Sequence, residues 1–219
     1  MRINTEDRNI LVDLARDYDT WLNAARLACD RLRWKKVAGK AYLYRILDSA
    51  GNATSLGPRN PDTERRFAAF EQALRSRDAA AERIARRAAV CTTSRLPAFA
   101  GRVLRELDLR GLLGSSYLVV GANALPAYAA EAGMLPSAVA AATERCDLAW
   151  SQPMLAMSAP QPPNSLFAAL RRVDRTCKVD VERPARVRSG KGDVVQLYLA
   201  TALADGWSPR EQIRPTRLR

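Results

Sequence analysis

A glycine bend between a predicted strand and a predicted helix is the first feature of this sequence that could do chemistry. Residues 117–120 form an uncharged, apolar run, and Gly121, Ala122 and Asn123 follow it directly. A strand that turns into a helix in this way presents the first N–H groups of the helix, at the positive end of the helix dipole. Gly121, Ala122 and Asn123 are therefore a candidate phosphate site. Small residues at a strand–helix turn also permit tight packing, and this alternative stays open.

Arg145 and Asp147 form the second candidate. They flank Cys146 at the start of an apolar segment, residues 146–150, that is typical of a short strand. Since side chains two positions apart on a strand share one face, both should point to the same side. The simplest expectation is an ion pair between them with no further role.

The absence of histidine narrows the possible chemistry. The 219 residues contain none, which excludes Ser-His-Asp triads, Cys-His dyads and His-ligated zinc. The four cysteines include no C-x-x-C pair, so neither a zinc knuckle nor a disulfide framework is indicated. Any reaction must use carboxylates, thiols, lysine, tyrosine or a metal.

The charge is strongly positive. Thirty-five Lys+Arg against 23 Asp+Glu give a net charge of +12, and arginine supplies most of the cations. Because arginine offers a bidentate fork to phosphate, this surplus favours a nucleotide or nucleic-acid partner. An arginine- and alanine-rich coding bias is the alternative. The charged N-terminus does not resemble a secretory signal, and residues 112–130 are too polar for a membrane span. We therefore expect a cytoplasmic protein with no membrane partner.

The elements that precede the two candidate sites are predicted to be mainly helical. Apolar spacing predicts a helix from residue 10 to about residue 32. Residues 41–47 and 53–57 read as a β-hairpin around a glycine turn. Asn60 and Pro61 indicate the start of a long helix that reaches about residue 89, and a shorter helix follows at residues 97–107.

The second half changes to an α/β pattern. We expect a strand at residues 117–120, buried on both faces, and then a helix at 123–132 that Gly133 ends. We then expect, in chain order, a strand at 146–150, a helix at 164–172, and strands at 176–181 and 194–199. The expected organisation is an N-terminal helical region with a β-hairpin (1–114), a core (115–204) and a basic tail (205–219). The predicted fold class is α+β with an α/β core.

Several segments, in order, carry a resemblance to a known family. They are Trp34-Lys35-Lys36, Tyr42-Leu43-Tyr44, Ser55-Leu56-Gly57-Pro58-Arg59, Asp62-Thr63-Glu64, Leu104-Arg105-Glu106-Leu107-Asp108, Gly111-Leu112-Leu113-Gly114, Val119-Val120-Gly121, Asn123-Ala124-Leu125, Ala127-Tyr128, Ala142-Thr143 and Asp147-Leu148. Over most of residues 20–200 the chain resembles a bacterial nucleotidyltransferase-fold family, related to DNA polymerase beta-like enzymes.

The resemblance implies a small mixed sheet flanked by helices, with a glycine turn that cradles the phosphates of a nucleoside triphosphate. In such a family, two carboxylates at positions i and i+2 of the next strand and a third on a later strand bind Mg²⁺. Two metal ions then stabilise the attacking hydroxyl and the leaving pyrophosphate during nucleotidyl transfer.

This sequence departs from that pattern at the metal-binding positions. Arg145 stands at the first carboxylate, Asp147 remains at the second, and Gln196 is the best match to the third. The residue after the glycine, often a hydroxyl residue, is Ala122. Arginine in place of a ligand repels a dication by roughly 8 kcal/mol at ~4 Å and an effective dielectric of ~20. Mg²⁺ should therefore bind weakly or not at all. Replacement ligands are conceivable among other acids, namely Glu144, Asp180, Glu182 and Asp193.

Two functions follow as expectations. The first is nucleotidyl transfer from a nucleoside triphosphate to an unknown acceptor, with Asp147 and Arg145 as catalytic residues and Asp147 as metal ligand. The alternative is a catalytically degenerate protein that binds nucleotide, RNA or DNA through the glycine turn and an arginine-rich surface. A structural, partner-binding role is a third. Trp34, Tyr42 and Tyr44 either stack on bases or pack on their neighbours.

Overall fold

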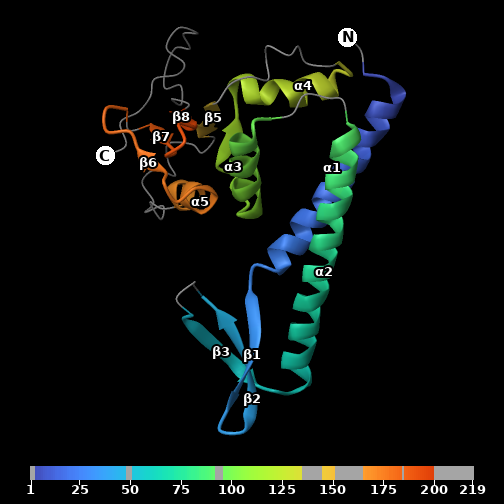
Figure 1. Cartoon of the computed structure of the whole chain (residues 1–219), viewed down its shortest axis with the longest axis vertical. Coiled ribbons are helices and arrows are strands. Elements are labelled where there is room, and N and C mark those ends of the chain that lie inside the picture. The colour runs from blue at the N-terminus through green and yellow to red at the C-terminus, as the bar shows by residue number, and fades with distance from the viewer. Residues whose placement is uncertain are drawn as a thin grey trace, which may run out of the picture. The chain divides into compact units, whose positions relative to one another are not determined.

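The computed structural model describes residues 3–47, 51–91, 96–134, 145–150, 165–183 and 185–199. The described chain forms two compact units (Figure 1). One comprises residues 9–91, and the other comprises the described residues before 9 and after 91. The mixture of helices with an antiparallel and a mixed sheet confirms the predicted α+β class. None of the described helices has the length and apolar character needed to cross a membrane.

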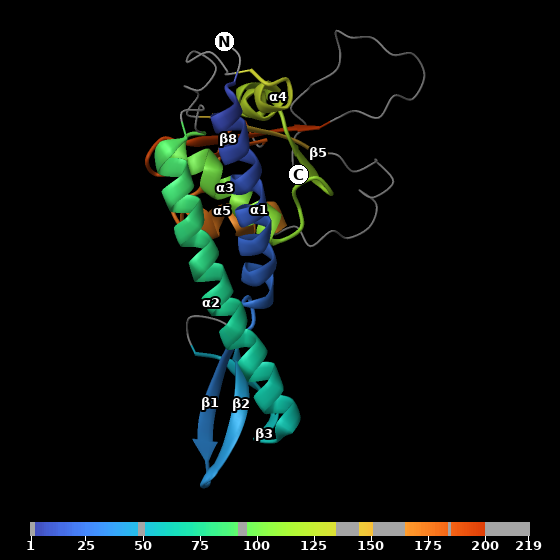
Figure 2. The same ribbon diagram turned by 90° about the vertical axis from the view of Figure 1, so that its right-hand side faces the viewer.

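Most of one long helix, a second long helix and a three-stranded sheet make up the unit of residues 9–91. Helix α1 (Thr5–Leu27) and helix α2 (Pro61–Val90) lie side by side in both views (Figures 1 and 2). Three strands, β1 (Arg31–Val37), β2 (Lys40–Ile46) and β3 (Ala53–Pro58), pair antiparallel in that order.

Local signals fix the start of α2. The Asn60 side chain accepts hydrogen bonds from the backbone N–H groups of Asp62 and Thr63, at 3.0 and 2.9 Å. The Thr63 hydroxyl accepts in return from the Asn60 N–H at 2.9 Å, which completes a capping box. Pro61 occupies the first turn, where its missing N–H costs nothing. The predicted helix and hairpin are confirmed here.

The predicted helix up to residue 32 is wrong at its end. Helix α1 ends at Leu27, and Leu32 lies in strand β1. Strand β1 pairs along the whole of β2, and Ala38 and Gly39 join them with positive φ angles of 49° and 78°. Such angles suit a two-residue hairpin turn. Leu32 is buried while its neighbours Arg31 and Arg33 are exposed, which is the alternation of a strand.

The other unit is built on a five-stranded mixed sheet in the order β4-β5-β8-β7-β6. The strands are β4 (Tyr117–Val119), β5 (Arg145–Trp150), β6 (Lys178–Val179), β7 (Arg186–Arg188) and β8 (Val194–Leu199). The central pair, β5 and β8, is parallel, and the other pairs are antiparallel. Strand β8 has its predicted bounds. Strand β6 covers two residues of the predicted 176–181, and β7 was not predicted.

Helices α3 (Ala98–Leu109) and α5 (Ser165–Val173) contribute to one core with this sheet. Val103 and Leu107 of α3, Leu170 of α5, and Leu148 and Val195 of the central strands are each at most 1% exposed. The core therefore lies on the sheet face that carries Cys146 and Leu148. The opposite face carries Arg145 and Asp147, because residues on a strand alternate.

Strand β4 is not buried on both faces as predicted. Tyr117 is buried, but Leu118 is 46% exposed. Strand β4 is at the edge of the sheet, where it pairs with β5. The chain then forms a 3-10 helix, η1 (Gly121–Ala124), and the short helix α4 (Leu125–Glu131), followed by Gly133 with a φ of 65°.

Candidate functional site: the glycine bend and the Arg145–Asp147 pair

The glycine bend lies directly against Asp147. Gly121 has a φ of 66°, which favours glycine, and a Cβ placed there would be 2.8 Å from Oδ2 of Asp147. The N–H of Val120 donates to the backbone carbonyl of Asp147 at 3.1 Å. The structure therefore brings together the two features that the sequence singled out.

Asn123 attaches the bend to strand β5. Its side chain is buried, and its Nδ2 donates to the backbone carbonyl of Arg145 at 2.5 Å. The Asn123 side chain therefore holds the bend against strand β5. Ala122 is half-buried, whereas Gly121 is exposed, so Gly121 presents backbone at the surface of the bend.

Arg145 and Asp147 form an ion pair on the site face. Nη2 of Arg145 donates to Oδ2 of Asp147 at 3.1 Å, and Nε lies 2.7 Å from Oδ1. The Asp147 side chain is 6% exposed and that of Arg145 is 47% exposed. The hydrogen bond to Asp147 raises the pKa of Arg145, against the opposing effect of partial burial. Oδ1 of Asp147 is buried and accepts no hydrogen bond from a described residue, although it is in ionic contact with Nε.

Gln196 lies beside Asp147, as the resemblance placed it. The parallel register of β5 and β8 pairs Asp147 with Gln196. The Gln196 side chain is already engaged, because its Nε2 donates to the carbonyls of Ala185 and Leu197 at 3.2 and 3.3 Å. An amide held in this way is a poor substitute for a metal-binding carboxylate.

Arg186 is a member of this face that sequence reasoning missed. It pairs with Gln196 in the register of β7 and β8, and its Nε donates to Oε1 of Gln196 at 3.1 Å. The alternation of Arg186, Val187 and Arg188 was the available signal, but three residues are too short to identify a strand. Arg145, Asp147, Gln196 and Arg186 thus form one row across three strands, with a net charge of +1. We call it the site row.

The site row does not fit a pair of Mg²⁺ ions. It holds one carboxylate, which a guanidinium already neutralises, and Mg²⁺ sites need several oxygen ligands with negative charge. Among the described residues, no group of three His, Cys, Asp or Glu side chains could hold a metal. The charge and chemistry of the row instead suit an anion.

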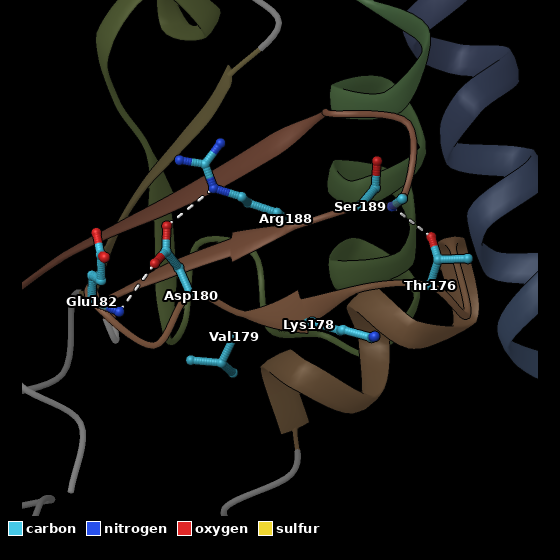
Figure 3. Close-up of a pocket in the computed structure, with 8 residues that line it drawn as sticks. Thr176, Lys178, Val179, Asp180, Glu182, Arg188 and Ser189 are labelled. Carbon is cyan, nitrogen blue, oxygen red and sulfur yellow. Dashed lines mark hydrogen bonds and ion pairs between the residues drawn. The ribbon is translucent and has the colours of Figure 1, made fainter.

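Three of the four alternative acids, Asp180, Glu182 and Asp193, are among the described residues. Asp180 and Glu182 line a pocket of about 630 Å³ at the β6 side of the sheet, where Arg188 donates to Asp180 at 3.0 Å (Figure 3). This contact lowers the pKa of Asp180. Asp193 accepts from the Ser189 hydroxyl at 2.8 Å. Glu144 is outside the described residues. The carboxylates of Asp180 and Asp193 thus bind Arg188 and Ser189 and no residue of the site row, although the Asp180 N–H donates to the backbone carbonyl of Arg186 at 2.9 Å.

Comparison with known proteins identifies a protein family that this chain matches. No curated protein and no solved structure gives a match. A family described as nucleotidyltransferase matches residues 98–214, which is just over half of the chain and includes the bend and every residue of the site row. Its general function is nucleotidyl transfer, which agrees with the resemblance in the sequence. Because this match covers more than half of the chain, the chain belongs to the nucleotidyltransferase family.

Proposed function

We propose that the site row and the glycine bend bind the phosphates of a nucleoside triphosphate without Mg²⁺. The observation that carries this proposal is the Arg145–Asp147 pair beside Gly121, because it puts a guanidinium where the resemblance implies metal-bound carboxylates. A three-carboxylate site would be strongly negative, whereas the row has a net charge of +1. Triphosphate is attracted to such a row without a metal to neutralise it.

Arg145 is suited to this task by its position. About half of its side chain is exposed, so its guanidinium can donate hydrogen bonds to phosphate oxygens while Asp147 orients it from the buried side. Arg186 supplies a second cation two strands away, and it is held by Gln196. The exposed backbone at Gly121 lets phosphate approach closely, because no side chain stands there.

Nucleotidyl transfer to an unknown acceptor is the second candidate. Family membership favours it, and so does the buried Oδ1 of Asp147, which accepts no hydrogen bond from a described residue. In that reaction an acceptor hydroxyl displaces pyrophosphate from the α-phosphorus. Asp147 would have to release Arg145 before it could take any part.

Calorimetry with nonhydrolysable analogues of the four common nucleoside triphosphates separates these candidates. The native chain should bind at least one analogue in the presence of EDTA. Arg145→Gln should weaken that binding about tenfold, since it removes charge-assisted hydrogen bonds. The control Arg172→Gln removes an exposed arginine of α5 and should change little. Binding that requires Mg²⁺, or equal losses in both variants, would contradict the proposal.

Arg145→Asp tests the same geometry in the opposite direction. This variant restores two carboxylates at positions i and i+2 of β5, and we expect it to gain Mg²⁺-dependent nucleotide binding. Pyrophosphate release by the native chain with Mg²⁺ and an acceptor, lost in Asp147→Asn, would instead support transfer.

A further inference from the structure

Two strands of the three-stranded sheet, β1 and β2, are strongly basic. Strand β1 carries four cations, Arg31, Arg33, Lys35 and Lys36, and β2 adds Lys40 and Arg45. The three strands contain no aspartate or glutamate. Like charges this close together repel one another, so their concentration does not itself stabilise the sheet.

The two faces of this sheet differ. Leu32 and Leu43 are buried on one face, where Trp34 packs against Phe67 of α2 with ring centroids 5.7 Å apart. This contact confirms the packing alternative for Trp34. Alternation places Arg31, Arg33 and Lys35 on the other face, together with Tyr42 and Tyr44. We call these five residues the basic tyrosine face.

The antiparallel register of β1 and β2 places cations of β1 beside tyrosine rings of β2 on the basic tyrosine face. Arg33 is paired with Tyr44, and Lys35 is paired with Tyr42. The ammonium of Lys35 also lies 5.8 Å from the centre of the Tyr44 ring. Both tyrosines are partly exposed, and the three cations are exposed. The rings therefore lie between cations on an accessible surface.

The cations of this face have no acidic partner among the described residues. Elsewhere in the same unit arginines are paired: Arg45 and Arg66 with Asp30, and Arg83 with Asp17. Arg31, Arg33 and Lys35 form no such pair within the described part of the chain. Along β1 they recur about every 6.8 Å, from a rise of about 3.4 Å per residue. That repeat suits a ligand with a series of negative charges.

We propose that the basic tyrosine face binds single-stranded nucleic acid. Phosphates would lie on Arg31, Arg33 and Lys35, and unpaired bases would stack on Tyr42 and Tyr44. A duplex hides its bases from such rings, and an acidic peptide or an anionic membrane gains little from stacking, so the juxtaposition of rings and cations favours a single strand. The proposal uses neither the glycine bend nor the site row, and it stands or falls separately from nucleotide binding there.

Fluorescence anisotropy of the full chain tests this inference with labelled 12-nucleotide oligo-U and oligo-dT, a duplex of the same length, and vesicles containing anionic lipid. Single strands should bind more tightly than the duplex. Tyr44→Leu should weaken their binding about tenfold, which is typical for the loss of one stacked base. Tyr128→Leu, at a tyrosine of α4 that is 69% exposed, is the control and should have no effect.

Lys35→Gln and Lys36→Gln form a second matched pair. Both remove one lysine charge from adjacent positions of β1, but only Lys35 belongs to the basic tyrosine face. Lys35→Gln should reduce the slope of log K against log salt by about 0.7, the value for one phosphate contact on a single strand, and Lys36→Gln should leave it unchanged. Equal effects of the two variants would overturn the proposal. Preference for the duplex, or vesicle binding with no loss in Tyr44→Leu, would do so as well.

Discussion

At the scale of single residues, the closest constraint in the site is between Gly121 and Asp147. A side chain at position 121 would collide with Oδ2 of Asp147 and would also have to adopt a φ of 66°. Asp147 cannot easily move away, since it is buried and paired with Arg145. The bend, the carboxylate and the arginine therefore behave as one assembly.

Gly121→Ala should accordingly destabilise the protein by more than its backbone strain alone, which is of order 1–3 kcal/mol. Gly111→Ala is a close control, because Gly111 also has a φ of 66° but a Cβ there meets nothing within 4 Å. We expect the midpoint of thermal unfolding to fall further for Gly121→Ala, and nucleotide binding to be lost in that variant only. Equal midpoints for the two variants would argue against a tight contact at Asp147.

The cysteine next to the site gives a second prediction. Burial, with Asp147 adding to it, raises the pKa of the Cys146 thiol to about 12, and burial also raises the pKa of Cys177. Only the thiolate reacts, so both should resist iodoacetamide at pH 8 while the exposed Cys29 is alkylated. Peptide mass spectrometry of native and urea-unfolded protein measures this. Alkylation of native Cys146 as fast as Cys29 would contradict its burial.

At the scale of elements, an ion-pair cluster joins α1 and α2. Arg83 and Arg87 contact the two oxygens of Asp17 at 2.6 and 2.8 Å. The hydrogen bonds from Arg83 and Arg87 lower the pKa of Asp17 in the folded protein. A carboxyl with a lowered pKa stabilises the fold above its unfolded pKa, near 3.8, and this contribution is lost as the pH falls through the folded pKa.

Asp17→Asn should therefore lower the midpoint of thermal unfolding at pH 7 by a few degrees and have progressively less effect below pH 4. Asp78→Asn is the control, because Asp78 is 64% exposed and pairs with its neighbour Arg77. Circular dichroism melts between pH 2 and pH 7 give the comparison. A deficit in Asp17→Asn that is as large at pH 2 as at pH 7 would show that the carboxylate is not the source of the effect.

The helices and strands differ in how well the sequence predicts them. Helix α2 was predicted to within about one residue, because Asn60, Thr63 and Pro61 act on neighbouring backbone. Strand β1 was not predicted, because its alternation of buried and exposed residues depends on its pairing with β2. The meeting of Gly121 with Asp147 followed from strand order and the family resemblance. The position of Arg186 in the site could not be predicted, because three residues are too few to identify a strand by their own pattern. Strand β7 joins the sheet through its pairing with β8.

At the scale of the whole molecule, each of the two units has its own buried residues. Leu43 is fully buried in the unit of residues 9–91, and Leu148 is fully buried in the unit that holds the site row. Both side chains are 0% exposed, so truncation of either leaves a cavity of similar chemistry. Each unit also has its own proposed ligand: single-stranded nucleic acid for residues 9–91, and nucleotide for the unit that holds the site row.

If the units are separate cooperative structures, Leu43→Ala and Leu148→Ala should each destabilise one of them, by roughly 2–5 kcal/mol. Hydrogen exchange with mass spectrometry should show lost protection in β2 and α2 for the first variant, and in β5 and β8 for the second. Leu118→Ala, at a leucine that is 46% exposed, should change neither. Loss of protection throughout the chain from a single substitution would mean that the units unfold as one, and the two binding surfaces could not then be tested independently of each other.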